Sequence, residues 1–170
     1  IKEFTDKINL VTFEFENIPF ETLKKINEIK KVLPNPEINK IIQNRLTEKD
    51  FVNKLNIQTT KYKLIRNKKD LEKSLDFIPG ILKTSTLGYD GKGQFKINTK
   101  NDLDIIKINL NKEYIFEKLI DLKKEMSVII TRFGPKKYEI YEPIENEHED
   151  QILKYSKIPA EIDRDIFEKS

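Results

Sequence analysis

The glycines of this chain are concentrated in one place, and this concentration limits how the flanking segments can fold. Three of the five glycines lie in the run from residue 88 to residue 94. A strand-like segment ending near Lys83 precedes the run, and the alternating segment Phe95-Lys96-Ile97 follows it. The pattern predicts two strands joined by a glycine loop. Because glycine lets backbone N–H groups turn toward a ligand, the loop either covers a phosphate or is an ordinary hairpin turn.

The spacing of the run excludes two common phosphate-binding motifs. It does not match GxxxxGK[ST], because Lys92 precedes the final glycine, and it is not a GxGxxG that opens a helix, because a strand follows. P-loop and Rossmann-loop interpretations therefore fail. Taken alone, Lys83 is more typical of a solvated charge than of a ligand.

Composition restricts the possible function classes. A hydrophobic content of 37% is enough for a core, and 32 basic and 29 acidic side chains nearly cancel. This balance indicates a solvated surface and argues against a nucleic-acid partner. The lack of cysteine excludes disulfides, thiolate metal sites and cysteine nucleophiles. No apolar run approaches a membrane span and no signal peptide is visible, so we expect no membrane partner and a cytoplasmic protein.

Both ends of the sequence suggest a fragment. The chain opens with Ile1 and not with an initiator methionine, and a strand predicted over residues 9–16 would need neighbours. At the other end, an amphipathic helix predicted from Glu161 stops at Ser170. We therefore expect a piece of a longer protein.

The first part of the chain is typical of the last α/β unit of an open sheet. In the strand over residues 9–16, the alternation places Glu14 and Glu16 on one face. A helix is predicted over residues 20–32, and the prolines at residues 34–36 end it with a rigid turn.

Residues 37–55 are predicted to be helical again, with two apolar groups separated by a polar interval. Arg45 and Lys49 lie four residues apart in that interval. Their side chains would project from one side of the helix, as two cations able to reach one anion.

A second α/β unit follows, and further strands come after it. The predicted elements are a strand at 62–65, a helix at 68–75, strands at 80–84 and 94–98, a helix from Asp102, and strands at 114–119, 126–132 and 138–143 with a turn at 134–135. His148 lies in an acidic stretch without metal-ligand spacing, which we interpret on its own as a solvated loop.

Five motifs then occur in a recognisable order. They are Phe13-Glu14-Phe15-Glu16-Asn17-Ile18-Pro19, Pro34-Asn35-Pro36, Gln43-Asn44-Arg45-Leu46-Thr47-Glu48-Lys49, Ile81-Leu82-Lys83-Thr84 with Leu87-Gly88-Tyr89-Asp90-Gly91-Lys92-Gly93-Gln94, and Glu145-Asn146-Glu147-His148. Together they resemble the 5-(carboxyamino)imidazole ribonucleotide synthase family, the ATP-grasp enzymes of bacterial purine biosynthesis. The resemblance runs through nearly the whole chain and covers roughly half of the family's usual length.

The resemblance implies a fold and a domain order. The expected class is α/β (α+β), an ATP-grasp fold preceded by the end of a Rossmann-like pre-ATP-grasp domain. By this likeness residues 1–37 end the first domain and residues 38–170 begin the ATP-grasp domain. A subdomain that carries the glycine flap would span about residues 60–117.

The resemblance also implies a reaction and its partners. ATP phosphorylates bicarbonate to carboxyphosphate, and the exocyclic amine of 5-aminoimidazole ribonucleotide is then carboxylated, which releases ADP and phosphate. The protein's contribution to such a step is mostly positioning and charge neutralisation. A homodimer is also expected by the likeness.

The family's site residues are carried over position by position. The ATP-binding residues implied are Arg45, Lys83, Gly88, Tyr89, Asp90, Gly91, Lys92, Gly93, Gln94, Glu117, Lys118, Leu119, Ile120, Glu125 and His148. Among them, residues 117–120 would present backbone groups to adenine, and Glu125 would accept hydrogen bonds from the ribose hydroxyls.

For the imidazole ribonucleotide we expect contacts from Glu14, Glu16, Tyr89 and Asp90. The alternative for the two glutamates is a buried, purely structural hydrogen-bonding pair.

Two departures from the family pattern matter. Gln151 stands where the family commonly has a glycine before Ile-Leu, which puts the placement of the His148 loop in doubt. The carboxy-terminal acidic and asparagine residues that hold magnesium against the phosphates are missing, so no metal ligands are expected in this chain. We therefore expect the chain alone to have no synthase activity.

Two other function classes stay open. One is a different ATP-grasp ligase, such as a formate-using purine transformylase or a biotin-carboxylase-like enzyme, although residues 13–19 and the glycine run together argue against it. The other is a non-catalytic nucleotide-binding module that keeps the flap without the chemistry.

Overall fold

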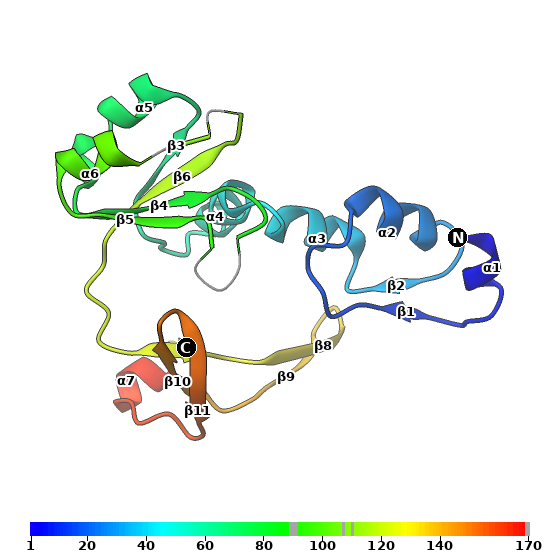
Figure 1. The fold of residues 1–170 in the computed structure, drawn as a ribbon. Coiled ribbons are helices and arrows are strands. Elements are labelled where there is room, and N and C mark those ends of the chain that lie inside the picture. Colours follow the sequence, from blue (N-terminus) through cyan, green and yellow to red (C-terminus); the bar gives the residue numbers. More distant parts are fainter. Residues whose placement is uncertain (89–91, 107, 110, 169–170) are drawn as a thin grey trace. The chain divides into compact units, whose positions relative to one another are not determined.

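The chain divides into two compact units, Ile1–Leu119 and Ile120–Ser170 (Figure 1). The computed structural model describes residues 1–88, 92–106, 108–109 and 111–168. Both units contain helices and strands, so the expected mixture of helices and strands is confirmed.

The first part of the chain contains two short parallel strands and the helix that connects them. After α1 (Lys2–Thr5), strand β1 (Val11–Thr12) pairs with β2 (Val32–Leu33), and helix α2 (Phe20–Asn27) connects them. Val11, Leu23, Ile26 and Val32 form a buried cluster between these elements. The period of the apolar residues in α2 places Leu23 and Ile26 on the face that is buried.

The strand predicted over residues 9–16 is wrong in its extent, because β1 ends at Thr12. In the parallel register Thr12 pairs with Leu33, and the next residue of the partner is Pro34, which has no N–H to donate. Glu14 and Glu16 consequently lie in a bend and a turn, where strand alternation does not apply.

Two predicted helices are shorter than expected. Helix α2 ends at Asn27, whose side-chain oxygen accepts a hydrogen bond from the N–H of Val32 at 2.9 Å, and Val32 is a strand residue. The helical segment at 37–55 is interrupted, giving α3 (Pro36–Ile42) and α4 (Arg45–Lys54). Asn44 causes the interruption, since its side chain caps α4 by accepting from the N–H groups of residues 46 and 47.

A four-stranded antiparallel sheet forms the centre of the first unit. Its strands are β3 (Tyr62–Ile65), β6 (Tyr114–Lys118), β4 (Gly80–Thr84) and β5 (Gln94–Ile97), in this spatial order. Helix α5 (Lys68–Glu72), the 3-10 helix η1 (Leu75–Phe77) and helix α6 (Lys100–Ile105) connect strands. The predicted helix at 68–75 is thus split in two, and α6 begins two residues before Asp102, which serves in its capping box with Thr99.

The register of the sheet separates its two faces. Leu82 pairs with Phe116, and both belong to a buried apolar cluster with Leu71 of α5. We call this side the helix face. Side chains of adjacent strand residues point the opposite way, so Lys83 and Glu117 lie on the other side, which we call the charged face.

The second unit is built from strands with short connections. Strand β7 (Glu125–Ser127) pairs with β10 (Ile144–Glu149), which pairs with β11 (Ile152–Lys157), while β8 (Ile130–Gly134) and β9 (Lys137–Ile140) form a separate hairpin. Helix α7 (Arg164–Phe167) follows.

Three predictions for the second unit are wrong in detail. The strand at 126–132 is two strands in two sheets, and the strand at 138–143 ends at Ile140. His148 lies in strand β10 and not in a loop. Both β10 and β11 were missed because neither strand has a buried residue, so no alternation of apolar and polar residues marks them.

Candidate functional site

A hollow of about 300 Å³ lies on the charged face of the first unit. Its lining comes from helix α4, the segment before β3, and strands β4 and β6. The lining residues are Arg45, Glu48, Lys49, Val52, Thr59, Lys83 and Glu117. The structure thus brings Arg45, Lys83 and Glu117 together.

Glu117 is the central charge of this hollow. Its side chain is only 8% exposed, and its two carboxylate oxygens contact two different lysines. Oε2 lies 2.8 Å from Nζ of Lys83, and Oε1 lies 3.3 Å from Nζ of Lys49. The two lysines satisfy the buried carboxylate, which would be costly to bury alone.

Lys49 was predicted to share an anion with Arg45, but the structure gives the two cations different protein partners. The guanidinium of Arg45 donates to the carbonyl oxygens of Thr84 at 2.9 Å and Gly88 at 2.8 Å. The backbone N–H of Arg45 donates to the carbonyl of Ser85. Arg45 therefore holds the first limb of the glycine loop, while Lys49 belongs with Glu117.

Polar contacts hold α4 on the charged face. Tyr62 donates a hydrogen bond from its hydroxyl to Asp50 at 2.5 Å and accepts one from Asn53 at 3.0 Å. Among the described residues of α4 not one is buried. The helix is thus attached by charges and hydrogen bonds, together with the stacking of Lys49 at 5.7 Å over the Tyr62 ring.

Glu48 adds an acid to the rim of the hollow. Partial desolvation raises the pKa of its carboxyl above 4.5, while Lys49 and Arg45 act to lower it. The negative charges of Glu16 and Glu117 act to raise it further. Protonation of Glu48 would therefore make the hollow more positive at a higher pH than for a free glutamate.

The glycine loop leaves the sheet beside this hollow. Tyr89, Asp90 and Gly91 lie outside the described residues. Gly93 has φ of 74°, a conformation that suits glycine, and a Cβ there would come within 2.8 Å of Oγ1 of Thr84. Gln94 begins β5 and pairs with Lys83, and Lys92 and Gly88 flank the undescribed part.

The segment expected to present its backbone to adenine is partly engaged within the protein. The N–H of Lys118 donates to Lys61, its carbonyl accepts from Thr60, and the N–H of Leu119 donates to Pro79. Ile120 begins the second unit. The side chain of Glu117, and not its backbone, is the part of this segment that lines the hollow.

Glu125 and His148 lie together in the second unit. Nδ1 of His148, on β10, is 2.5 Å from Oε2 of Glu125, on β7. They line a hollow of about 680 Å³ whose other lining residues are Leu122, Lys123, Lys124, Glu145, Asn146, Glu147, Tyr155, Lys157 and Glu161. Within this hollow Lys124 donates to Glu145 at 2.8 Å and lowers the pKa of that carboxyl.

Gln151 lies in the turn between β10 and β11. It has φ of 68°, and Asp150 before it has φ of 51°. A residue with φ in this range suits the tight turn of a hairpin, and glycine adopts it at the lowest cost. Gln151 therefore makes the turn that a glycine would make, and the pairing of β10 with β11 is preserved on both sides of it.

Glu14 and Glu16 are both exposed, which contradicts the alternative of a buried structural pair. It is the backbone carbonyl of Glu16 that is held, by the side-chain amide of Gln43 at 2.6 Å. The same amide also donates to the carbonyl of Ile18 at 2.6 Å.

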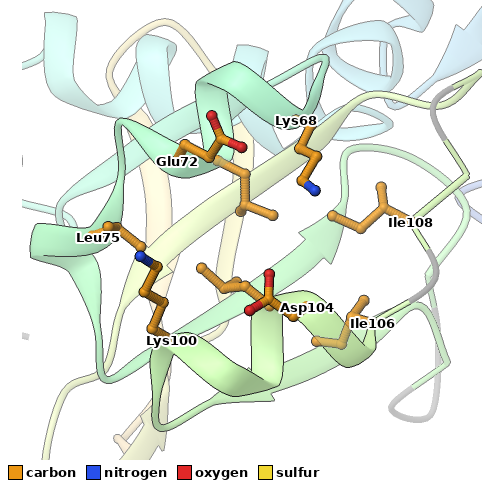
Figure 2. Close-up of a pocket in the computed structure, with 9 residues that line it drawn as sticks. Lys68, Glu72, Leu75, Lys100, Asp104, Ile106 and Ile108 are labelled. Carbon is orange, nitrogen blue, oxygen red and sulfur yellow. The ribbon is translucent and has the colours of Figure 1, made fainter.

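A larger hollow of about 750 Å³ lies on the helix face (Figure 2). Leu71, Leu75, Leu103, Ile106 and Ile108 line it between α5 and α6. Figure 2 shows charged side chains such as Lys68 and Lys100 at its margins. Its lining offers mainly apolar contacts, so we do not assign the phosphate chemistry to it.

The described part of the chain contains no group of three or more histidine, cysteine or acidic side chains arranged to hold a metal ion. No helix among the described residues is long and apolar enough to cross a membrane.

The sequence predicted that Lys49 reaches an anion together with Arg45, but it gave neither the pairing of Lys49 with Glu117 nor the place of Glu48 in the lining. The signal for Lys49 was present, because it lies one helical turn after Arg45. Its pairing with Glu117 could not be found from the sequence, since 68 positions separate the two residues and only the register of β6 beside α4 brings them together.

Comparison with known proteins assigns two successive parts of the chain to two domain families. The Ribonucleotide synthetase preATP-grasp domain family matches residues 1–43, and the ATP-grasp domain family matches residues 50–170. Neither range tests the boundary at residues 37 and 38, which stays a prediction. The N5-carboxyaminoimidazole ribonucleotide synthase of Staphylococcus aureus (strain MRSA252) is 34% identical over 167 residues, which are 96% of this chain and 45% of that protein.

Two crystal structures superpose closely on the chain. The ADP complex of N5-carboxyaminoimidazole ribonucleotide synthetase has a TM-score of 0.91 at 32% identity, covering 99% of this chain and 45% of that one. The Staphylococcus aureus enzyme complexed with ADP has a TM-score of 0.89 at 31% identity, covering 99% and 46%. The chain thus spans less than half the length of these relatives. Since the ATP-grasp match extends over more than half of its residues, the chain belongs to the ATP-grasp domain family.

Proposed function

We propose that the charged face of the first unit binds the phosphates of ATP, as part of an N5-carboxyaminoimidazole ribonucleotide synthase. The observation that carries the proposal is the hollow in which Arg45, Lys49 and Lys83 converge beside the glycine loop. These three cations outnumber the two carboxylates of the lining, Glu48 and Glu117, so the hollow keeps an excess of positive charge. The names of the relatives supply the substrate class.

In this proposal the nucleotide contacts are those that the family resemblance implies. Lys83 and the backbone N–H groups of residues 88–94 bind the phosphates, while Arg45 keeps the loop's first limb in place. Residues 117–120 contact adenine through their remaining backbone groups, and Glu125 accepts hydrogen bonds from the ribose hydroxyls. His148 holds the Glu125 carboxylate in orientation through the 2.5 Å contact.

The reaction proposed is the ATP-dependent carboxylation of 5-aminoimidazole ribonucleotide. Bicarbonate oxygen attacks the γ-phosphorus, ADP leaves, and the carboxyphosphate formed passes its carboxyl group to the exocyclic amine while phosphate leaves. Positioned cations stabilise the charge that develops on the transferred phosphoryl group. Glu14, Glu16, Tyr89 and Asp90 are proposed to contact the imidazole ribonucleotide.

Magnesium is proposed to accompany ATP, with ligands outside this chain. Among the described residues the hollow on the charged face has Glu48 and Glu117 as its carboxylates, and Glu117 is already paired with two lysines. That lining suits phosphate oxygens better than a divalent cation. A homodimer and a cytoplasmic location stay predictions.

The test is turnover by the protein expressed from the complete reading frame that encodes this chain. Phosphate release should require ATP, bicarbonate and 5-aminoimidazole ribonucleotide together, and the carboxylated ribonucleotide should form in equal amount. Phosphate release that does not depend on the ribonucleotide would favour another ATP-grasp ligase. Nucleotide binding without any phosphate release would favour a non-catalytic module.

A second test uses the purified 170-residue chain alone. We expect it to bind nucleotide and to show no synthase activity, because it spans 45% of its relative's length. Carboxylation by the purified chain alone would contradict this expectation.

A further inference from the structure

The side chain of Glu117 connects two lysines that come from different elements. Lys49 is on helix α4 and Lys83 is on strand β4, and the carboxylate of Glu117 on β6 lies between their ammonium groups at 3.3 and 2.8 Å. The lysine side chains are 18% and 22% exposed, so all three groups are largely enclosed. Because both contact one carboxylate, the two positive charges are kept within a limited distance of each other.

The contacts leave both lysines able to bind something else. Each ammonium group has three N–H donors; Lys83 donates one hydrogen bond to Glu117, and Lys49 forms an ion pair with it. Tyr62 restrains Lys49 further, because the ammonium group lies 5.7 Å from its ring centroid. Both lysines line the same hollow, in which the remaining donors would meet a ligand with several oxygens.

We infer that Glu117 is a positioning residue for a two-lysine phosphate clamp, in which Lys49 contacts the phosphate chain of the nucleotide beside Lys83. This inference rests on the proposed function, since it takes the charged face to bind ATP. It gives Lys49, one of the cations that line the hollow, a direct contact with the phosphates. It also gives the Glu117 side chain a role that is separate from backbone contacts to adenine.

A positioning role can be distinguished from a simple charge effect by the sign of one substitution. Glu117→Gln removes a negative charge from an anion-binding hollow, so Coulomb attraction alone predicts tighter binding of an anion. If Glu117 acts by holding the two lysines in place, the same substitution weakens binding instead. The neutral amide keeps the shape of the side chain but holds two ammonium groups far less strongly.

The experiment is calorimetric titration of the purified chain with inorganic tripolyphosphate, and separately with ATP and adenosine. Lys49→Met should weaken tripolyphosphate and ATP binding by about tenfold or more, the usual loss for one charge-assisted contact. Adenosine binding should stay the same, because it lacks the phosphates. Lys63→Met is the matched control, since Lys63 also pairs with an acid, Asp76 at 2.6 Å, but on the helix face of the same sheet.

Glu117→Gln should weaken tripolyphosphate binding by about threefold or more, with circular dichroism and the melting temperature confirming that the variant is folded. In the Glu117→Gln background, adding Lys49→Met should cost less than in the wild type, because the two residues act together. If Glu117→Gln does not fold, tripolyphosphate binding by Lys49→Met still tests whether Lys49 contacts the phosphates. Tighter anion binding by Glu117→Gln, unchanged binding by Lys49→Met, or no tripolyphosphate binding by the wild-type chain would overturn the inference.

Failure of the proposed function gives a different result. In that case the protein from the complete reading frame releases phosphate independently of 5-aminoimidazole ribonucleotide, while tripolyphosphate binding to the chain still depends on Lys49. The clamp would then stand, and the substrate assignment would not.

Discussion

The two faces of the four-stranded sheet are attached to their neighbours in opposite ways. On the helix face, Leu71 of α5 packs into an apolar cluster with Leu82 and Phe116. On the charged face, α4 is held through Tyr62 and Glu117, and not one described residue of this helix is buried. The larger hollow lies on the apolar side, and the smaller one has the charges that can bind phosphate. The proposal of a phosphate site in the smaller hollow therefore follows the chemistry of the lining and not its size.

The largest expected effect is on the helix face and concerns stability alone. Leu71→Ala should lower the free energy of unfolding by about 2–5 kcal/mol, because Leu71 is 4% exposed and its removal leaves a cavity. Urea titration measures this loss. Leu75→Ala, at a position that is 37% exposed in the same hollow, should cost clearly less. A folded Leu71→Ala chain that no longer binds tripolyphosphate would contradict the separation of the two faces.

The next effect is on the charged face and concerns affinity. Lys83→Met should weaken ATP binding by about 10- to 100-fold, because a largely enclosed ammonium group is lost from the phosphate end. Titration calorimetry of the chain measures the dissociation constant. Lys96→Met is the control, since Lys96 is on the same face of neighbouring strand β5 but is exposed and does not line the hollow. An unchanged constant for Lys83→Met would remove this lysine from the site.

A smaller effect should appear where α4 meets the sheet. Tyr62→Phe removes the hydrogen bonds of its hydroxyl to Asp50 and Asn53, and we expect a loss of about 1 kcal/mol. Amide hydrogen exchange should become faster in α4, while the amides of α5 serve as an internal control. Equal acceleration in both helices would mean that α4 is not held separately by polar contacts.

The smallest effect is a pH dependence. The pKa of Glu48 is raised in the folded chain, so ionised Glu48 costs stability there, and this cost grows as pH rises from the unfolded pKa through the folded one. Glu48→Gln should therefore be more stable than the wild type at neutral pH. The gain should vanish at pH values well below 4.5. Urea midpoints of the two proteins across this range measure it, and a gain that persists in acid would show a different cause.

Much of the first unit could be predicted from the sequence, because its elements carry clear local signals. The strands at 80–84 and 94–97 follow from apolar alternation around the glycine run. Asn44 before Arg45 is a typical helix cap, although the predicted helical segment at 37–55 ran through it. The limits of β1 could not be predicted, because they depend on Pro34, which follows the partner strand β2. Strands β10 and β11 have exposed faces, so the hydrophobic pattern that usually marks strands is missing.

The candidate site was predicted as a set of residues, but not as a set of contacts. The sequence placed Arg45 and Lys83 at an anion, whereas the structure shows that the Arg45 guanidinium holds the carbonyls of Thr84 and Gly88. Glu117 was chosen for its backbone, and its side chain proves to be the buried centre of the hollow. Such pairings depend on tertiary packing between segments far apart in the chain, which local patterns do not encode.

The alternation in strand β6 has a practical consequence for anyone who engineers this chain. Phe116 fills the apolar cluster, and its neighbour Glu117 faces the lysines. One amino acid inserted or deleted within Tyr114–Lys118 would shift the later residues to the opposite side. The carboxylate of Glu117 would then point into the apolar cluster, and the ring of Phe116 would point toward the lysines of the charged face. Peptide tags and labels therefore belong outside this five-residue segment, where a change in length leaves both surfaces intact.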